Sequence, residues 1–352
     1  MTTNMTDLIK EKKLNFNSLC TNEEIQMYLD TEGIGVDQVK YYLRNMGDYS
    51  QYRKYPVCVL SHMYDPKRSR FLTQLKGEAE LRGLDRQYLI FILEDQKDLY
   101  AEIENIRLVF VDDSDPEYAG LCGKRQFIYD WLIQNSHDHG FFIEDDCFDF
   151  VLPIGALGKT GSFRNKRFNM SFSFTFSFWE FLIDSEGLQY SGPVNNMEFA
   201  FRNLSENPFI KHLAQTVQAV HIGVKYSHDR GIRFDQGSGW DDYDMIINQC
   251  INGQGTHGII FSYNTPSLRS GVSAMSSDAD ALAKRCEINT TALIKKWGLS
   301  LVREDTKKGL YNAKVHWFNI RKCYNENLDL QMLPGITNEE AKKLIKEALS
   351  TR

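Results

Sequence analysis

Three adjacent acids in the stretch HGFFIEDDCFDF, residues 139–150, are the first residues in this chain whose types and spacing could do chemistry. Glu144, Asp145 and Asp146 follow an apolar run and have no Lys or Arg near them in the sequence. Such a group of like charges is costly unless a cation binds it. If the backbone stays extended, Glu144 and Asp146 point to one side and can share Mg²⁺ or Mn²⁺, while Asp145 points to the other. The alternative is a solvated loop whose acids cap the segment that follows.

A second group of acids, WDDYD at residues 240–244, comes directly before apolar residues at helical spacing. Asp241 fits the N-cap of that helix, and Asp242 and Asp244 then fall in its first turn. Acids at these positions complement the helix dipole, which would explain all three without any catalytic role.

The elements that must position the first group are strands. Four apolar runs, at residues 55–62, 87–95, 106–113 and 139–146, each end in polar or acidic residues. Helical patterns separate the first run from the second and the third from the fourth, which predicts an α/β fold with a mostly parallel sheet flanked by helices. Since ligands bind beyond the carboxyl ends of parallel strands, the repeated polar ends favour a metal–diphosphate site over a solvated loop.

The second half of the chain has a different texture. Phe alternates with Ser or Thr from Phe172 to Phe178, which predicts an amphipathic antiparallel strand. Further elements are predicted from similar patterns, namely strands at residues 217–227, 256–264 and 311–322 and helices at residues 239–255 and 278–297.

Length and composition bound the class of protein. At 352 residues and 42% hydrophobic, the chain can bury a large core. The formal net charge of -6 argues mildly against a whole-surface affinity for nucleic acid. Seven scattered cysteines without a CxxC pair indicate reduced thiols rather than disulfides or a zinc site. Because no signal-peptide core and no apolar segment of about 18 residues is present, we expect a soluble cytoplasmic protein without a membrane span.

Four sequence blocks resemble the nucleotide-sugar-dependent glycosyltransferases of the GT-A fold, in the order that this family has them. They are VCVLSHMYDPKRSR (57–70), GLCGKRQFIYDWL (120–132), FFIEDDC (141–147) in place of the family's DxD element, and GWDDYDMIINQCINGQG (239–255). Gln126 stands where the family usually has Asn. Within the family the chain looks most like the phage and TET/JBP-associated group that adds sugars to hydroxymethylated pyrimidines in DNA. A phage protein of this kind would act in the cytoplasm of its host cell.

The resemblance implies how the chain is divided. We expect a helical N-terminal extension at residues 1–53 and a helical C-terminal tail at residues 325–352. Between them, residues 54–150 would form the nucleotide-sugar-binding half of a GT-A domain. Residues 151–324 would form its acceptor-side half, which includes the antiparallel subregion.

The resemblance also implies roles for single residues. Asp146 would be the main ligand of a Mn²⁺ or Mg²⁺ ion, with Glu144 as a second contact and His257 as a third ligand; His316 is the other candidate for that position. The donor would contact a set of residues near the strand ends, namely Ser61, Arg70, Glu94, Gly123, Arg125 and Asp145.

The same resemblance makes Asp242, or its neighbour Asp241, the general base that deprotonates the acceptor in an inverting transfer. A retaining enzyme would not use this base. Trp240 would lie on the acceptor side, where its ring could stack on a sugar or a base.

The implied reaction moves a sugar from a UDP-sugar to a 5-hydroxymethylpyrimidine, most simply 5-hydroxymethylcytosine, in double-stranded DNA. A basic loop that follows the acid triplet could contact the DNA backbone through Lys159, Arg164, Lys166 and Arg167. Two alternatives stay open. One is a GT-A transferase with a polysaccharide, protein or lipid-linked acceptor, and the other is a non-catalytic nucleic-acid-binding protein with a degenerate GT-A fold. No obligate protein partner is implied.

Overall fold

The computed structural model describes most of the chain between residues 52 and 320. The described residues are 52–82, 84, 86–153, 167–169, 172–193, 210–212, 218–234, 240–259, 262–264, 279–307, 310–317 and 319–320. The predicted terminal segments, 1–53 and 325–352, therefore lie almost wholly outside the described residues. None of the described helices has the length and apolar character that a membrane span needs.

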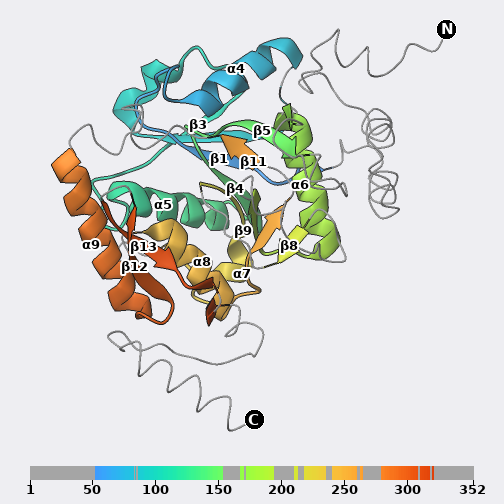
Figure 1. The fold of residues 1–352 in the computed structure, drawn as a ribbon. Helices are drawn as coiled ribbons and strands as arrows, with labels where there is room; N and C mark the ends of the chain where they lie inside the picture. Colours follow the sequence, from blue (N-terminus) through green and yellow to red (C-terminus); the bar gives the residue numbers. More distant parts are fainter. Residues whose placement is uncertain are drawn as a thin grey trace. The chain divides into compact units, whose positions relative to one another are not determined.

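The chain forms two compact units, and each is built from segments that alternate along the sequence (Figure 1). The first unit draws on Met1–Phe110, His139–Ile222 and His257–Pro266, and the second on Val111–Asp138, Gly223–Thr256 and Ser267–Arg352. The chain returns to each unit more than once, and the predicted halves at residues 54–150 and 151–324 stay a prediction.

A parallel sheet of four strands is the centre of the first unit. Its strands are β1 (Val57–Leu60), β2 (Tyr88–Ile92), β3 (Arg107–Phe110) and β4 (His139–Glu144). They lie in the order β3-β2-β1-β4, and each neighbouring pair is parallel. The four predicted strands are confirmed. β2 is buried along its whole length, as strands of parallel sheets usually are, and its branched and aromatic residues suit such a position.

The sheet continues beyond β4 with short strands of mixed direction, in the order β9 (Ala219–Gly223), β7 (Tyr190–Pro193), β10 (His257–Ile259) and β8 (Ile210–His212). β7 is antiparallel to β9 and parallel to β10, whereas β8 is antiparallel to β10. The predicted α/β fold with a mostly parallel sheet is therefore confirmed.

A separate antiparallel sheet also belongs to this unit. It joins β11 (Ser262–Asn264), β5 (Phe148–Pro153) and β6 (Arg167–Asn169). The single strand predicted at residues 256–264 is thus two strands, β10 and β11, that belong to two sheets. The predicted antiparallel subregion is present.

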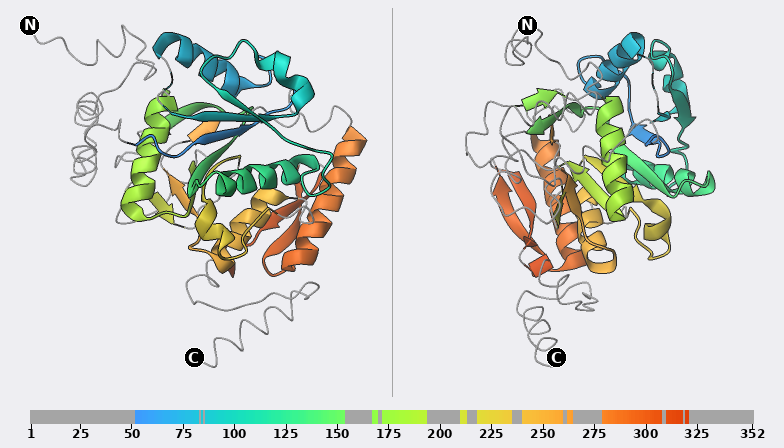
Figure 2. Two further views of the ribbon diagram at one scale, coloured as in Figure 1. Left: turned by 180° about the vertical axis from the view of Figure 1, so that it is seen from behind. Right: turned by 90° about the vertical axis from the view of Figure 1, so that its right-hand side faces the viewer.

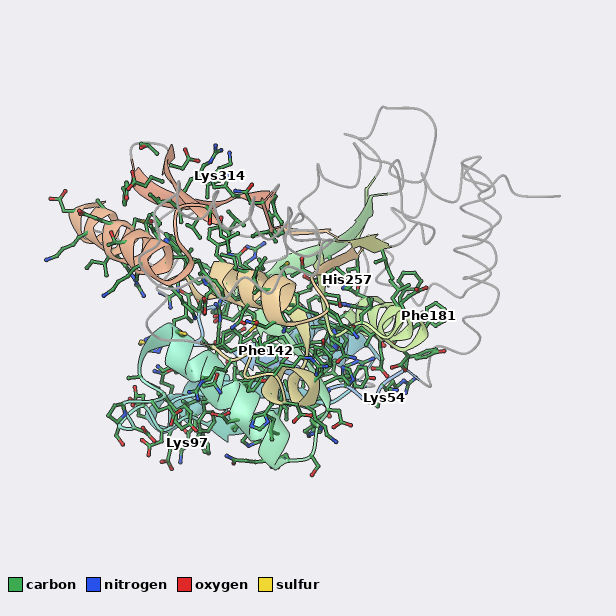
Figure 3. All side chains as sticks on the ribbon, turned by 90° about the horizontal axis from the view of Figure 1, so that it is seen from below. Lys54, Lys97, Phe142, Phe181, His257 and Lys314 are labelled. Atoms are coloured by element: carbon green, nitrogen blue, oxygen red, sulfur yellow. The ribbon has the colours of Figure 1, made fainter. Side chains whose placement is uncertain are left out.

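Two helices, α4 (Arg70–Arg82) and α6 (Phe172–Glu186), share one hydrophobic core with the sheet (Figure 2). The ring of Phe71 in α4 stacks on that of Phe172 in α6, with centroids 4.4 Å apart. Phe141 of β4 belongs to the same cluster. Phe142 lies among the crowded side chains at the centre of the view, whereas Lys97 lies at its margin (Figure 3).

The strand predicted from Phe172 to Phe178 is wrong, because these residues begin α6. Alternation of apolar and hydroxyl residues indicates a strand only where one face meets solvent. From Thr175 to Ile183 every residue of α6 is buried, so the hydroxyl positions do not mark an exposed face. Phe172, Phe176 and Trp179 instead follow the spacing of one helical face.

The second unit holds helices and a hairpin. They are α5 (Gly120–Gln134), α7 (Val224–His228), α8 (Asp241–Asn252), α9 (Ala279–Trp297), β12 (Val302–Lys307) and β13 (Leu310–Val315). The predicted helices at residues 239–255 and 278–297 are confirmed as α8 and α9. The hydroxyl of Tyr129 in α5 donates to the carbonyl oxygens of Val224 and Ile232, at 3.0 and 2.9 Å, and so fastens the α7 segment to α5.

Candidate functional site

The four parallel strands reverse their order between β1 and β4: β2 and β3 lie on one side of β1, and β4 lies on the other. In open α/β sheets, ligands bind beyond the carboxyl ends of the strands at such a point. Ser61 directly follows β1, and Glu144 ends β4 in register with Leu60 of β1. The acid triplet and Ser61 therefore come together at the place where a ligand is expected.

Asp145 is held by hydroxyl groups from the segment between β1 and α4. Ser61 Oγ donates to Asp145 Oδ2 at 2.6 Å, and Ser69 Oγ donates to the same oxygen at 3.0 Å. Burial raises the pKa of the Asp145 carboxyl, and the two serine hydrogen bonds oppose that shift. The carboxylate thus anchors the β1–α4 segment to the end of β4, and its contact with a ribose stays a prediction.

A turn, not extended backbone, carries Asp145 and Asp146. β4 ends at Glu144, and the N–H of Cys147 donates to the carbonyl oxygen of Glu144 at 3.1 Å, which closes a four-residue turn. The predicted strand-like alternation of these acids is therefore wrong. Burial raises the pKa of the Cys147 thiol well above its usual value, so this cysteine is a poor nucleophile.

Glu144 and Asp146 are both half-buried and offer the hard oxygen donors that Mg²⁺ and Mn²⁺ prefer. Such an ion usually keeps water and takes phosphate oxygens, so two carboxylates are a sufficient protein contribution. Within the described residues, no group of three or more His, Cys, Asp or Glu side chains is placed to hold a metal ion by itself. The donor set therefore fits an ion that is shared with a diphosphate.

His257, the predicted third metal ligand, lies on a different strand from these acids, and its role stays a prediction. It lies on β10, three strands away from β4 in the sheet, or roughly 14 Å at ordinary strand spacing. Its Nδ1 lies 3.2 Å from the carbonyl oxygen of Tyr190.

Residues that the sequence did not single out shape the same edge of the sheet. The 3-10 helix η2 (Glu94–Tyr100) follows β2 and supplies two buried side chains, Gln96 and Tyr100. The hydroxyl of Tyr100 donates to Ser61 Oγ at 2.8 Å. Gln96 accepts from the N–H of Met63 at 2.9 Å and contacts the ring of His62 at 3.0 Å. The available signal was their spacing of four residues directly after a buried strand.

Arg70 and Glu94, two of the predicted donor contacts, lie at the first positions of α4 and η2 with exposed side chains. Burial raises the pKa of Asp145, and after the two serine hydrogen bonds the charge that opposes this shift most is that of Arg68. Arg68 also donates to the carbonyl oxygens of His62 and Met63, at 3.4 Å each. The roles of Arg70 and Glu94 stay predictions.

In the second unit, the predicted donor contact Arg125 pairs with the predicted catalytic acid Asp241. Asp241 is the first residue of α8, and Trp240 is the N-cap without a side-chain capping bond. The predicted N-cap role of Asp241 is therefore wrong, because its carboxylate is bound by Arg125 of α5. Gly123 is buried in the first turn of α5, which begins three residues earlier, at Gly120.

Asp242 differs from both neighbouring acids of this turn. It is half-buried, and one of its carboxylate oxygens accepts a hydrogen bond from the backbone N–H of Tyr243 at 2.9 Å. Burial and the adjacent charge of Asp241 raise the pKa of Asp242 to about 6, and Arg125 opposes them. A carboxylate with such a pKa is suited to accept a proton near neutral pH.

The predicted acceptor side is described only in part. The indole N–H of Trp240 donates to Thr290 Oγ1 at 3.1 Å, so this half-buried ring is held by α9. Arg167 begins β6, and its side chain is outside the description. Lys159, Arg164 and Lys166 lie outside the described residues.

No protein-family model and no curated protein sequence matches this chain. Among solved structures, it is similar to a mannosyltransferase from Pyrobaculum calidifontis, in complex with GDP-Man and Mn²⁺. That match has 12% identity and a TM-score of 0.42, and it covers 93% of this chain and 85% of the other.

A second similar structure is glucosyl-3-phosphoglycerate synthase from Mycobacterium tuberculosis, in complex with Mn²⁺, UDP and glucosyl-3-phosphoglycerate. It has 11% identity and a TM-score of 0.37, and the match covers 77% of this chain and 89% of the other. At these identities and TM-scores the similarities carry no argument about activity, which is argued below from the residues.

Proposed function

We propose that this protein is a metal-dependent glycosyltransferase with a nucleotide-sugar donor. The observation that carries the proposal is the acid triplet at the point where the parallel sheet reverses its strand order, beside Ser61. This is where open α/β sheets bind nucleotides. Two of the four sequence blocks that resemble GT-A glycosyltransferases, residues 57–70 and 141–147, coincide with this edge of β1 and β4.

The donor is assigned to the first unit. Glu144 and Asp146 would hold Mn²⁺ or Mg²⁺, which when bound offsets the charge of the diphosphate and of the leaving nucleotide. Ser61 lies close to the nucleoside in this assignment, and Tyr100 and Gln96 keep the surrounding segments in place.

Asp242 is the proposed general base. The charge of its neighbour Asp241 is balanced by Arg125. The carboxylate of Asp242 takes the proton of the acceptor hydroxyl, and the oxygen of that hydroxyl forms a bond to the anomeric carbon of the sugar. The bond from this carbon to the diphosphate oxygen breaks, and its electron pair leaves with the nucleotide. A pKa of about 6 keeps Asp242 mostly ionised at neutral pH and still able to accept a proton.

For the acceptor we propose a 5-hydroxymethylpyrimidine in double-stranded DNA, with a UDP-sugar as donor. This part of the proposal rests on the sequence resemblance and on the basic loop that contains Lys159, Arg164, Lys166 and Arg167. The enzyme would extrude the base or use the substituent that the major groove exposes.

The donor assignment is tested by calorimetric titration with UDP and with GDP, in Mn²⁺ and in EDTA. We expect the wild type to bind one of them only with the metal, and Asp146→Asn to weaken that binding by at least about tenfold while its melting temperature is unchanged. Asp98→Asn, an exposed acid of η2, is the matched control and should bind like the wild type. A wild type that binds neither nucleotide with any metal would leave the non-catalytic alternative.

The acceptor assignment is tested separately, with hydroxymethylcytosine-containing duplex DNA, a panel of UDP-sugars and mass spectrometry of the released nucleosides. We expect one donor to add the mass of a sugar. Nucleotide binding without any mass gain on DNA, and without salt-sensitive DNA binding, would favour a polysaccharide, protein or lipid-linked acceptor instead.

A further inference from the structure

The three acids in the first turn of α8 have three different partners, although the sequence presents them together. Asp241 pairs with Arg125 of α5. Asp244 is 1% exposed, and its two oxygens accept from Trp297 Nε1 at 2.6 Å and from Lys296 Nζ at 2.8 Å. Asp242 lies between these two ion pairs, and no basic side chain is hydrogen-bonded to it among the described residues.

Helix α9 holds this turn on both sides of Asp242. Trp240, two residues before Asp242, donates to Thr290 of α9 at 3.1 Å. Asp244, two residues after it, accepts from Trp297 of α9. Thr290 and Trp297 are seven residues apart and so lie on the same face of α9, about 10 Å from each other along the helix axis. Two contacts at this separation fix the direction of the α8 turn as well as its position.

Helix α9, which makes both contacts, is held in place by its own packing. Thr290 and Leu293 are completely buried, and Trp297 is 8% exposed. Helix α9 lies against the hairpin of β12 and β13, and Gly298, at φ +75°, ends the helix. The N–H of Val302 then donates to the carbonyl oxygen of Gly298 at 3.0 Å, which joins the end of α9 to the start of β12.

We propose that Asp244 and Thr290 are positioning residues, which hold the first turn of α8 against α9 so that the carboxylate of Asp242 is aimed at the acceptor hydroxyl. The catalytic part of this inference rests on the proposed role of Asp242 as general base. Asp244 itself touches no reacting atom, because both of its oxygens are used by α9. One carboxylate oxygen of Asp244 balances the charge of Lys296, and the other accepts the hydrogen bond from the indole N–H of Trp297.

The charged groups around Asp242 make the arrangement testable by titration. Asp241 and Arg125 face it from α8 and α5, and Asp244 with Lys296 forms the second ion pair of the turn. With both pairs closed, Asp242 keeps the half-buried environment in which it titrates at about 6. If the turn loosens, water reaches the carboxylate and its titration midpoint falls towards the ordinary value of 3.8.

The experiment compares Thr290→Val with Thr291→Val, the same change at the exposed neighbouring position of α9. We expect Thr290→Val to lower kcat of sugar transfer about 10- to 100-fold without changing donor affinity, since small misplacements of a reacting group have effects of this size. Thr291→Val should match the wild type. Asp244→Asn should resemble Thr290→Val, and if it fails to fold, Thr290→Val still decides.

The titration of Asp242, followed by carboxyl ¹³C NMR, is the readout that needs no substrate. We expect a midpoint near 6 in the wild type and in Thr291→Val, and a lower midpoint in Thr290→Val. Equal midpoints and equal kcat values in the two valine variants would overturn the inference. A wild type without donor binding would instead refute the proposed function, and the NMR comparison would still report whether α9 sets the environment of Asp242.

Discussion

Identical carboxylates take different roles in this molecule because their immediate neighbours differ. In the α8 turn, Arg125 balances the charge of Asp241, Lys296 balances that of Asp244, and Asp242 is left with a raised pKa. At the end of β4, the hydroxyl groups of Ser61 and Ser69 bind Asp145.

The positions of these acids were predictable from the sequence, but their partners were not. Arg125 and Asp241 are 116 residues apart, and Ser61 and Asp145 are 84 apart. No local pattern reports a pair of this kind. The sequence therefore predicted Asp242 only through a family resemblance, and it missed the contact of Asp244 with α9 altogether.

Asp242→Asn should make the protein more stable at neutral pH and inactive. The pKa of Asp242 is about 6 in the folded protein and 3.8 ordinarily, so the folded state holds this proton more tightly. Stability therefore falls as the pH rises from about 4 to 6, and above 6 the fold carries the full cost of the buried charge. The asparagine removes that cost, which is on the order of 1 kcal/mol after solvent screening.

Urea unfolding at pH 4 and at pH 7.5 measures this effect, with Asp98→Asn as the exposed control. We expect the wild type and the Asp242→Asn variant to differ in their free energies of unfolding at pH 7.5 and to converge at pH 4. An equal difference at both pH values would show that packing, and not ionisation, is the cause.

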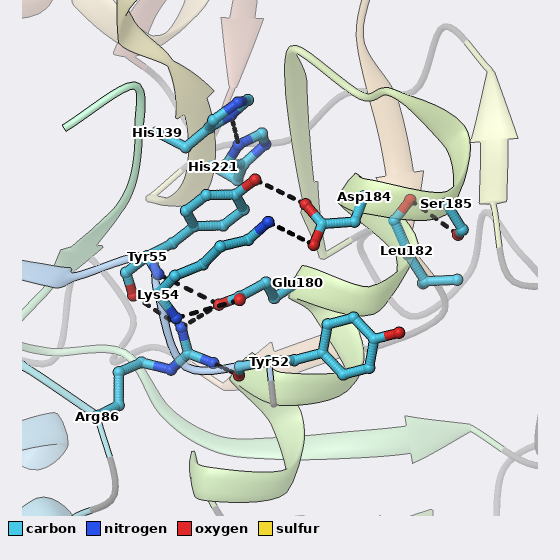
Figure 4. A network of polar contacts seen from close by, with 10 residues as sticks. All are labelled: Tyr52, Lys54, Tyr55, Arg86, His139, Glu180, Leu182, Asp184, Ser185 and His221. Carbon is cyan, nitrogen blue, oxygen red and sulfur yellow. Dashed lines mark hydrogen bonds and ion pairs between the residues drawn. The ribbon is translucent and has the colours of Figure 1, made fainter. Parts of the chain in front are cut away.

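At the scale of elements, α6 is fastened to the segment that enters β1 by one buried carboxylate (Figure 4). Glu180 of α6 accepts from the backbone N–H groups of Lys54 and Tyr55, at 3.1 and 3.3 Å, and pairs with Arg86. The side chains of Arg86 and Glu180 are 2% and 0% exposed. Arg86 also donates to the carbonyl oxygen of Tyr55 at 2.7 Å.

Glu180→Gln should therefore destabilise the first unit strongly, by about 3–5 kcal/mol, because it leaves the guanidinium of Arg86 buried without a counter-charge. The same helix offers a control in Asp184, which pairs with Lys54 at 2.7 Å, where the lysine side chain is 55% exposed. Asp184→Asn should cost less than about 1 kcal/mol. Chemical denaturation of both variants measures the difference, and equal losses would contradict a dominant role for the buried pair.

Helices and strands were predictable from the sequence where the spacing of apolar residues matches the face that is buried in the structure. The short apolar runs that became β1, β2 and β4 are almost wholly buried, and buried parallel strands need no alternation; β3, at the edge of the sheet, is partly exposed. The α6 segment defeated the same reasoning, since Glu180, Ser177 and Thr175 are buried with their aromatic neighbours. Glu180 and Ser177 both accept from Arg86, which is remote from them in the sequence.

At the scale of the whole molecule, the two compact units interleave along the chain, so neither is visible as a continuous stretch of sequence. The acid triplet and the strand-order reversal belong to the first unit, and the α8 turn with Asp242 belongs to the second. A boundary near residue 150 was the natural prediction from the change in sequence texture. The residue pattern along the sequence reports local composition only. The units are defined by contacts between segments that lie far apart in the chain, such as β4 and β9.

Donor binding should therefore stabilise the first unit. At a nucleotide concentration of about 100 times Kd, binding adds about 2.7 kcal/mol to the free energy of unfolding, or about 100-fold slower hydrogen exchange for amides that exchange only through unfolding. We expect UDP or GDP with Mn²⁺ to produce this protection in β1 and β4, and EDTA or Asp146→Asn to abolish it. Equal protection of α8 and α9 would mean that the units unfold together, because binding to one then stabilises both. Protection of α8 and α9 without any in β1 and β4 would contradict the assignment of the donor to the first unit.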